Sequence, residues 1–202
     1  MALLGRTEAT LRVTAAEVEA VGGGVVVVPA DVSLEEDVRR AAEAVEASLG
    51  APAVLVNNAG IAGRRAPVEE TSPSEWDAVM AANLRGLFLV TRAFLGGMRA
   101  AAGRRRLVTV ASISSTLGTS GLAPYCAAKW GALGFTKALA EEVRGSGIQA
   151  LAVLPGSVDT PMLAVGGFAP QMGPEDVAGL VVYAALDAPD AMNGSAIECF
   201  GP

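Results

Sequence analysis

Short and almost wholly apolar runs alternate along this chain with longer stretches of helix length. We predict strands at residues 2–5, 25–29, 53–57, 106–111, 148–154 and 195–200. We predict helices at residues 8–20, 34–49, 74–102, 122–144 and 174–186. A strand that is apolar at nearly every position suits a parallel sheet that is covered on both faces. The alternation therefore predicts an α/β fold with a doubly wound parallel sheet, formed by residues 1–202 as a single domain.

Three of the predicted helices have recognisable starting residues. Ser33 precedes the helix 34–49, Ser72-Pro73 precedes the helix 74–102, and Gly173-Pro174 opens the last helix. A serine side chain can accept a hydrogen bond from a free N–H group at a helix start, and proline fits the first turn. We therefore expect Ser33 and Ser72 to be N-caps.

The charge and the apolar pattern exclude several kinds of partner. Lys plus Arg number 15 against 21 Asp plus Glu, which gives a net charge of −6. An acidic chain without a basic run is poorly suited to nucleic acid or to an anionic membrane. The chain has no uninterrupted run of about 18 apolar residues that could span a bilayer, and its apolar start is too short for a signal peptide. We expect a cytoplasmic protein.

Histidine is absent, and only Cys126 and Cys199 are cysteines. Without histidine, Ser-His-Asp and Cys-His catalysis and His-ligated metal sites are excluded. Two distant cysteines cannot form a disulfide framework, so we expect reduced thiols. We predict no metal site.

Several polar residues are placed where a doubly wound sheet binds its ligands. Tyr125 and Lys129 are four residues apart, which puts both on one face of the predicted helix 122–144. Ser112 follows the predicted strand 106–111, and Asn57 ends the strand before it. Ligands bind in the crevice beyond the carboxyl ends of such strands. Asn83 lies inside a predicted helix, where asparagine is a poor helix former.

These residues belong to an ordered set of motifs. The set is Asn57-Asn58-Ala59-Gly60, then Asn83, then Ser112 thirteen residues before Tyr125-x-x-x-Lys129, then Pro155-Gly156-x-Val158-x-Thr160. In this set the chain resembles the short-chain dehydrogenase/reductase family, in its smaller single-domain branch, from residue 2 to residue 202. The resemblance implies a Rossmann-like fold and hydride transfer between a nicotinamide cofactor and a carbonyl or alcohol substrate.

The resemblance also gives each catalytic residue a role. Tyr125 is expected to be the general acid/base, with Lys129 nearby to favour the phenolate and to hold the nicotinamide ribose. Ser112 is expected to hydrogen-bond the substrate oxygen as charge develops on it. Asn83 is expected to hold a water in a proton relay to Lys129.

Further positions match cofactor-binding residues of the family. They are Asp31 and the Val32 backbone at the adenine, Asn57, Ala59 and Gly60 along the adenosine and ribose, and Pro155, Gly156, Val158 and Thr160 around the nicotinamide. Where an acidic residue would select NAD(H), the chain has Gly5 followed by Arg6, and arginine there accommodates the 2′-phosphate of NADP(H). We therefore expect NADP(H) rather than NAD(H).

The chain departs from the family at its start. The family has a strand, a glycine-rich turn and a helix ahead of the segment that corresponds to residues 2–5, and their backbone amides hold the pyrophosphate. A mis-called start codon, a truncation and a loss of nucleotide binding all remain open. Without that strand, either the pair 2–5 and 25–29 moves inward to the strand 53–57, or a gap stays open between them. A non-catalytic binding or assembly module is the alternative function.

Two features bear on the substrate and on assembly. The segment 161–170 is short and apolar, which favours a small carbonyl or alcohol substrate with an apolar or acyl group. The helical segments 83–98 and 125–139 are apolar almost all round, which is more apolar surface than one sheet face can cover. In the family these two helices pair across a two-fold axis, so we expect a homodimer or homotetramer.

Overall fold

Six parallel strands form two sheets rather than one. The computed structural model describes residues 1–201, apart from the side chains of residues 165 and 166. The first sheet pairs β1 (Ala2–Gly5) with β2 (Val26–Pro29), and the second has the order β3 (Val54–Asn57), β4 (Arg105–Val110), β5 (Ile148–Pro155) and β6 (Ala196–Cys199). Each predicted strand is present within one or two residues of its predicted ends, and every pairing is parallel, as the apolar runs indicated.

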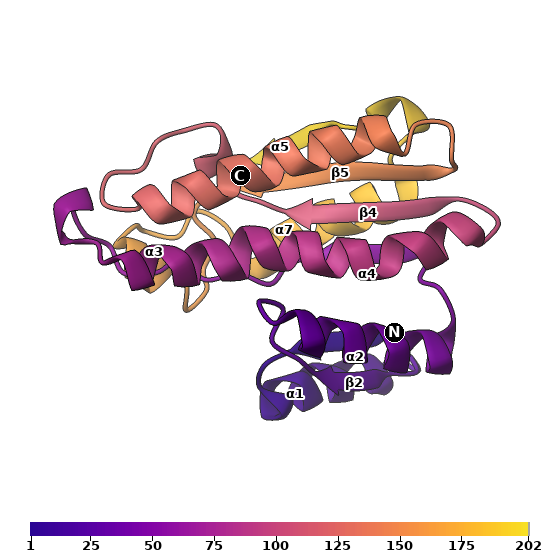
Figure 1. Cartoon of the computed structure of the whole chain (residues 1–202). Helices are drawn as coiled ribbons and strands as arrows, with labels where there is room; N and C mark the ends of the chain where they lie inside the picture. Colours follow the sequence, from indigo (N-terminus) through magenta and orange to yellow (C-terminus); the bar gives the residue numbers. More distant parts are fainter. Residues whose placement is uncertain (202) are drawn as a thin grey trace.

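Helices connect the strands and cover both faces of the four-stranded sheet. The long helices are α1 (Glu8–Ala20), α2 (Glu35–Leu49), α3 (Pro73–Met80), α4 (Gly86–Ala100), α5 (Ala123–Glu142) and α7 (Pro174–Val182). The short helical segments are η1 (Val68–Glu70), η2 (Ala81–Arg85), η3 (Ile113–Ser115), α6 (Leu163–Gly166), η4 (Tyr183–Asp187) and η5 (Asp190–Met192). Figure 1 shows α4 and α5 in front of the sheet and α7 behind it.

The alternation of side chains along the strands divides the core between these two faces. On β4, Leu107 packs with residues of α4 and α5, whereas Val108 packs on the other face with Ala184 and Ala185 of η4. The side chains of Val108, Ala184 and Ala185 on this second face are all buried. The sheet is therefore covered on both sides, which is the doubly wound α/β arrangement.

The first sheet is attached to the rest of the molecule through α2. Figure 1 shows β2 with α1 and α2 as a separate layer beneath α4. Val38 of α2 shares a core cluster with Leu89 and Phe94 of α4, and Glu35 forms an ion pair with Arg92. Among the described residues, β1 and β3 share no backbone hydrogen bond. Of the two arrangements expected from the sequence, the structure has the open gap.

One of the two expected serine caps is wrong. Ser72 is the N-cap of α3, and its side chain accepts a hydrogen bond from the Glu75 backbone in a complete capping box. Ser33 does not cap α2, whose N-cap is Leu34 without a side-chain bond. The Ser33 hydroxyl instead donates to Oδ1 of Asp31 at 2.7 Å. The same carboxylate oxygen also accepts a hydrogen bond from the Ser33 backbone N–H.

The predicted helix 74–102 is three helical pieces, α3, η2 and α4, which run on without a break from Pro73 to Ala100. By length and composition alone, this is the one helix of residues 1–201 that could cross a membrane. Its α4 part buries seven residues and packs in the core against α2 and β3. We therefore read it as a core helix.

Candidate active site

The first turns of α5 bring a phenol and an ammonium group together. Pro124 lies in the first turn of α5, and Tyr125 and Lys129 follow one helical turn apart. The Lys129 side chain is 6% exposed, and its Nζ donates a hydrogen bond to the Val110 carbonyl at 3.0 Å. The same Nζ lies 5.7 Å from the centre of the Tyr125 ring. The expected pair is thus assembled and is fixed to the end of β4.

Ser112 follows β4 and reaches the same place from the sheet. Its backbone is extended, and its hydroxyl accepts a hydrogen bond from the Ser114 N–H at 3.1 Å, which caps the short helix η3. The Ser112 side chain also lies within hydrogen-bonding reach of Tyr125, where it partly offsets the effect of burial on the Tyr125 pKa. Ser114 and Ser115 are buried in η3, where the Ser114 hydroxyl is bonded to Thr119. Of these three serines, Ser112 is the one that contacts Tyr125.

Asn83 lies in the π-helical turn η2 and holds the loop that follows β3. Its Oδ1 accepts a hydrogen bond from the Ile61 N–H at 3.0 Å, and its Nδ2 donates to the Ile61 carbonyl at 2.8 Å. Gly60 lies so close that a Cβ there would be 2.4 Å from the Asn83 Oδ1 and 3.9 Å from the Lys129 Nζ. Asn83 and Lys129 therefore line the same small space. The water relay expected of Asn83 stays a prediction.

Burial sets the protonation of the site. It lowers the pKa of Lys129 from 10.5 to about 8, because the ammonium has left water. Burial also raises the pKa of Tyr125 above 10.0, and the hydrogen bond from Ser112 offsets this only in part. The direction is opposite to the lowering that we expected from the nearby Lys129. Tyr125 is therefore a protonated phenol at neutral pH.

The residues expected at the adenosine end of the cofactor lie at the carboxyl ends of β1 and β2. Arg6 follows β1 and is exposed, and Asp31 lies two positions after the end of β2. The Asp31 N–H donates to the Asp37 carboxylate at 2.9 Å. Val32 packs against α4, where a Cβ on Gly86 would be 2.8 Å from it. Within residues 1–201, no hydrogen bond or ion pair joins Arg6 to the Tyr125 cluster, so the role of Arg6 stays a prediction.

The remaining cofactor positions line the ends of β3 and β5. The Asn57 amide donates to the Thr91 hydroxyl of α4 at 3.2 Å, which ties this end of β3 to the helix, while Ala59 is exposed. After the buried Pro155, the Gly156 N–H donates to the Cys199 carbonyl at 2.8 Å. Val158 forms a bridge with Met172, and the Thr160 hydroxyl donates to the Val158 carbonyl at 3.4 Å.

The hydrogen-bonding groups of Tyr125 and Lys129 suit the ribose hydroxyls in the nicotinamide half of a dinucleotide. Gly60 and Gly156 are packed against the protein itself, because a Cβ would lie 2.4 Å from the Asn83 Oδ1 at Gly60 and 3.3 Å from the Cys199 carbonyl at Gly156. For the pyrophosphate, no glycine-rich turn that opens a helix follows a strand in residues 1–201.

Comparisons with known proteins agree with this arrangement. A family model described as short chain dehydrogenase matches residues 1–166. This chain belongs to the short-chain dehydrogenase family. It is 38% identical over 195 residues to an acetoacetyl-CoA reductase of Shinella zoogloeoides, a match that covers 88% of this chain and 78% of that protein. It is 35% identical over 194 residues to a (3R)-3-hydroxyacyl-CoA dehydrogenase of Canis lupus familiaris, covering 89% and 74%.

Solved structures show the same fold. A gluconate 5-dehydrogenase from Burkholderia cenocepacia J2315, in complex with NADP and tartrate, superposes with a TM-score of 0.90 at 29% identity and covers 99% of this chain and 83% of its own. A levodione reductase superposes with a TM-score of 0.90 at 28% identity, covering 98% and 84%. This short-chain dehydrogenase is therefore an NAD(P)-dependent oxidoreductase with a Rossmann-like fold.

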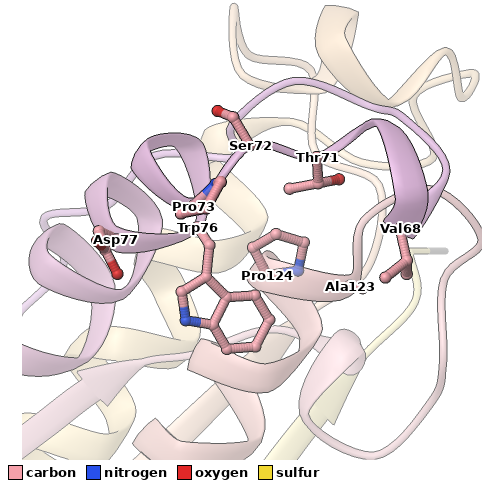
Figure 2. Close-up of a pocket in the computed structure, with 8 residues that line it drawn as sticks. All are labelled: Val68, Thr71, Ser72, Pro73, Trp76, Asp77, Ala123 and Pro124. Carbon is pink, nitrogen blue, oxygen red and sulfur yellow. The ribbon is translucent and has the colours of Figure 1, made fainter.

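Two apolar pockets of this short-chain dehydrogenase lie on the outside of its helices. Figure 2 shows the first, of about 300 Å³, with Trp76 from α3 and Pro124 from α5 turned toward it. The second, of about 530 Å³, is lined by residues of α3, η2 and α4 and by Phe135. Trp76 and Phe88 are about 40% exposed, and Trp130 is 53% exposed. The second pocket, with Phe88 and Phe135, lies on the apolar helix surface that predicted an oligomer, whereas the first pocket lies outside the segments 83–98 and 125–139.

Sequence reasoning missed some contacts that shape the site. The carbonyl groups of Val110 and Ile61 hold Lys129 and Asn83, and backbone acceptors have no sequence signature. It also passed over Arg65, whose side chain joins the loop before α5 to the segment after β5. An adjacent pair of arginines in a loop after a strand was the available signal.

Proposed function

We propose that this short-chain dehydrogenase reduces a small carbonyl substrate, and oxidises the corresponding alcohol, with NADP(H) as cofactor. The observation that carries the proposal is the meeting of Asn83, Ser112, Tyr125 and Lys129 beyond the carboxyl ends of β3 and β4. These groups come from three separate parts of the chain. A surface tyrosine–lysine pair would need none of the others, whereas proton transfer to a substrate oxygen uses them all.

Tyr125 is the proton donor in the direction of reduction. Its phenol is protonated at neutral pH and bonded to the Ser112 hydroxyl, so both groups can reach one substrate oxygen. Tyr125 gives its proton to that oxygen while Ser112 keeps a hydrogen bond to it, which stabilises the developing negative charge. Lys129 lies over the Tyr125 ring and stabilises the phenolate that remains.

The nicotinamide cofactor supplies the hydride when it is bound. Lys129 would hold the hydroxyls of its ribose, and Gly60 would lie beside the ribose. Pro155, Gly156, Val158 and Thr160 would frame the nicotinamide at the end of β5. Asn57, Ala59, Asp31 and Val32 would line the adenosine side.

The direct test is the replacement of Tyr125 by phenylalanine. Removal of the proton donor should lower kcat/KM for carbonyl reduction by about 10²–10⁴-fold, since that is the contribution of a positioned acid. NADPH oxidation with a panel of ketones and 3-oxoacyl thioesters measures it, in protein made from the complete reading frame. Tyr183→Phe is the matched control, because Tyr183 lies on η4 and bonds to Met192. Equal activity of the Tyr125→Phe and wild-type proteins would reject the assignment, and no activity in wild type would favour a non-catalytic module.

The preference for NADP(H) rests on Arg6. This exposed cation follows Gly5 at the end of β1, at a place where the 2′-phosphate of NADP(H) would otherwise have no positive partner. NADPH should therefore bind more tightly than NADH, and Arg6→Asp should reverse or abolish the preference. Titration of both cofactors measures this. NADH as the tighter ligand of the unmodified protein would contradict it.

The substrate that we favour is a 3-oxoacyl thioester or a related small ketone. Two observations support this choice of substrate. The segment 161–170 is apolar, and the relatives above are named an acetoacetyl-CoA reductase and a (3R)-3-hydroxyacyl-CoA dehydrogenase. We further propose a cytoplasmic homodimer or homotetramer, assembled through the apolar surface of α3, α4 and α5 that holds both pockets. Light scattering at micromolar concentration should give twice or four times the mass of the chain.

A further inference from the structure

The segment 161–172 leaves the sheet after β5 and returns to it. The Gln171 N–H donates to the Ser157 carbonyl at 2.8 Å, and the Asp159 N–H donates to the Met172 carbonyl at 2.9 Å. These bonds hold the two ends of the segment beside residues 155–160, which we place at the nicotinamide. The middle of the segment includes α6 and Phe168, and it is contacted from across the site by Arg65.

Arg65 contacts two segments that border the site. Its guanidinium carbon lies 5.1 Å from the centre of the Phe168 ring, a cation–π contact. Its Nε donates a hydrogen bond to the Ser120 carbonyl at 3.2 Å. Ser120 belongs to the loop 116–122, which leads directly into Tyr125. A single side chain thus connects the segment 161–172 to the loop ahead of the proton donor.

Two glycines make room for this side chain. A Cβ on Gly121 would lie 2.9 Å from the Arg65 Cγ, and a Cβ on Gly167 would lie 3.6 Å from its Nη1. Both glycines have positive φ, +77° and +65°, which favours glycine at each. The Ala66 N–H also donates to the Gly121 carbonyl at 2.9 Å, which fixes the backbone next to Arg65. The path of the arginine is therefore formed by both loops.

The neighbouring Arg64 is used differently. It donates to the Glu75 carboxylate at 2.8 Å and to the Glu70 carbonyl at 2.6 Å, so it fixes η1 and the start of α3. Two adjacent arginines of the same loop thus bind different partners, and in the described part of the chain Arg65 is the one of the two that contacts the segment 161–172. This difference provides a matched control.

We propose that Arg65 is a positioning residue that ties the segment 161–172, through Phe168, to the loop 116–122 and so encloses the substrate beside Tyr125. The link to the substrate rests on the proposed function, whereas the tie itself does not. Loss of the tie leaves the reacting groups in place and releases one wall of the substrate site.

Amide hydrogen exchange tests the tie without any need for activity. Peptides that cover Phe168 should exchange about two- to fivefold faster in Arg65→Met and in Phe168→Leu, which corresponds to an exposed cation–π contact. The double variant Arg65→Met/Phe168→Leu should exchange no faster than Arg65→Met, because the contact between Arg65 and Phe168 is already lost in that single variant. Phe168→Tyr keeps an aromatic ring and should restore slow exchange, and Arg64→Met should match wild type. Additive effects of the two single changes, or equal effects of Arg64→Met and Arg65→Met, overturn the tie.

Steady-state kinetics test the link to the substrate. If the segment 161–172 contacts the substrate equally in the ground and transition states, loss of this contact changes KM alone. Arg65→Met should therefore raise the KM for the carbonyl substrate about two- to fivefold and leave kcat and the KM for NADPH unchanged. An unchanged carbonyl KM in an active Arg65→Met enzyme overturns the proposal even where exchange is faster. If wild type itself is inactive, the proposed function fails, and the exchange experiment still decides the tie.

Discussion

The ammonium group of Lys129 is buried away from water at the candidate active site. Within residues 1–201 its ammonium donates one hydrogen bond to the protein, to the Val110 carbonyl, and burial is the cause of its lowered pKa. A charge that has lost its water and gained one neutral acceptor destabilises the folded state. At the scale of single residues, therefore, the proposed catalytic arrangement and the stability of the fold are opposed.

Replacement of Lys129 by methionine should make the protein more stable and inactive. The pKa of Lys129 is about 8 when folded and 10.5 in the reference state, so the unfolded chain holds the proton more tightly. The destabilisation is complete below pH 8 and disappears as the pH rises from about 8 to about 10.5. Lys129→Met should thus gain on the order of 3 kcal/mol at pH 7 and little at pH 10.5. Urea unfolding at both pH values measures the difference.

The chain supplies a control for this experiment. Lys137, the other lysine, lies exposed on the same helix α5. Lys137→Met removes the same charge from the same helix without a change in burial, and its stability should stay close to wild type at both pH values. A stability of Lys129→Met below wild type at pH 7 would show that the ammonium contributes more through its hydrogen bond than it costs by desolvation.

At the scale of elements, Gly60 and the turn η2 act as one unit. A Cβ at position 60 would overlap the Asn83 Oδ1 at 2.4 Å, and Asn83 is held by three bonds to backbone at Ile61 and Val79. Gly60→Ala should therefore displace Asn83 and destabilise the protein by about 1–3 kcal/mol, as overpacking does. Gly134→Ala is the control, since nothing lies within 4 Å of a Cβ there. A urea midpoint for Gly60→Ala equal to wild type would contradict the coupling.

The same turn shows where sequence patterns stop being informative. The pattern placed α1 at its observed bounds, Glu8–Ala20, and found one continuous apolar helix after Ser72. It could not show that this helix changes to a π-turn at Ala81–Arg85. There the Asn83 Nδ2 bonds to the Val79 carbonyl at 2.9 Å, and this carbonyl is the one that a regular α-helix would pair with the Asn83 N–H. The departure depends on a tertiary partner, Ile61, which is 22 positions away.

The cluster was accessible from sequence for a different reason. Ser112, Tyr125 and Lys129 have fixed spacing, and the carboxyl ends of parallel strands meet at one edge, so their meeting follows from the fold. The protonation of Tyr125 did not follow. It depends on how deeply the phenol is buried and on its bond to Ser112, and both are properties of packing rather than of spacing.

At the scale of the whole molecule, the sequence left two sheet arrangements open, and the packing of α2 distinguishes them. Val38, Ala42 and Val45 of α2 are buried in the core that α4 also forms, and Arg85 of η2 donates to the Ser33 carbonyl. Because α2 is fixed against α4, the pair β1–β2 cannot approach β3 without loss of this core. The Val56 side chain of β3 is accordingly 41% exposed. The hydrophobic contacts of one helix thus outweigh the pairing of strand edges.

The open gap should make the first sheet the least stable part of the polypeptide 1–202 studied by itself. A two-stranded sheet is marginally stable in water, and within residues 1–201 the edge of β1 that faces the gap pairs with no other strand. Residues 1–30 should therefore show the fastest amide exchange of the regular elements, whereas β4 and β5, which are paired on both sides, should be the slowest.

The same polypeptide should bind NADPH very weakly, since its strands lack a following glycine-rich turn to hold the pyrophosphate. Exchange monitored by mass spectrometry and calorimetric titration with NADPH measure the two effects. Protection of β1 equal to that of β5, or micromolar affinity for NADPH in protein verified by mass to span 1–202, would show that another segment stabilises this edge or binds the phosphates.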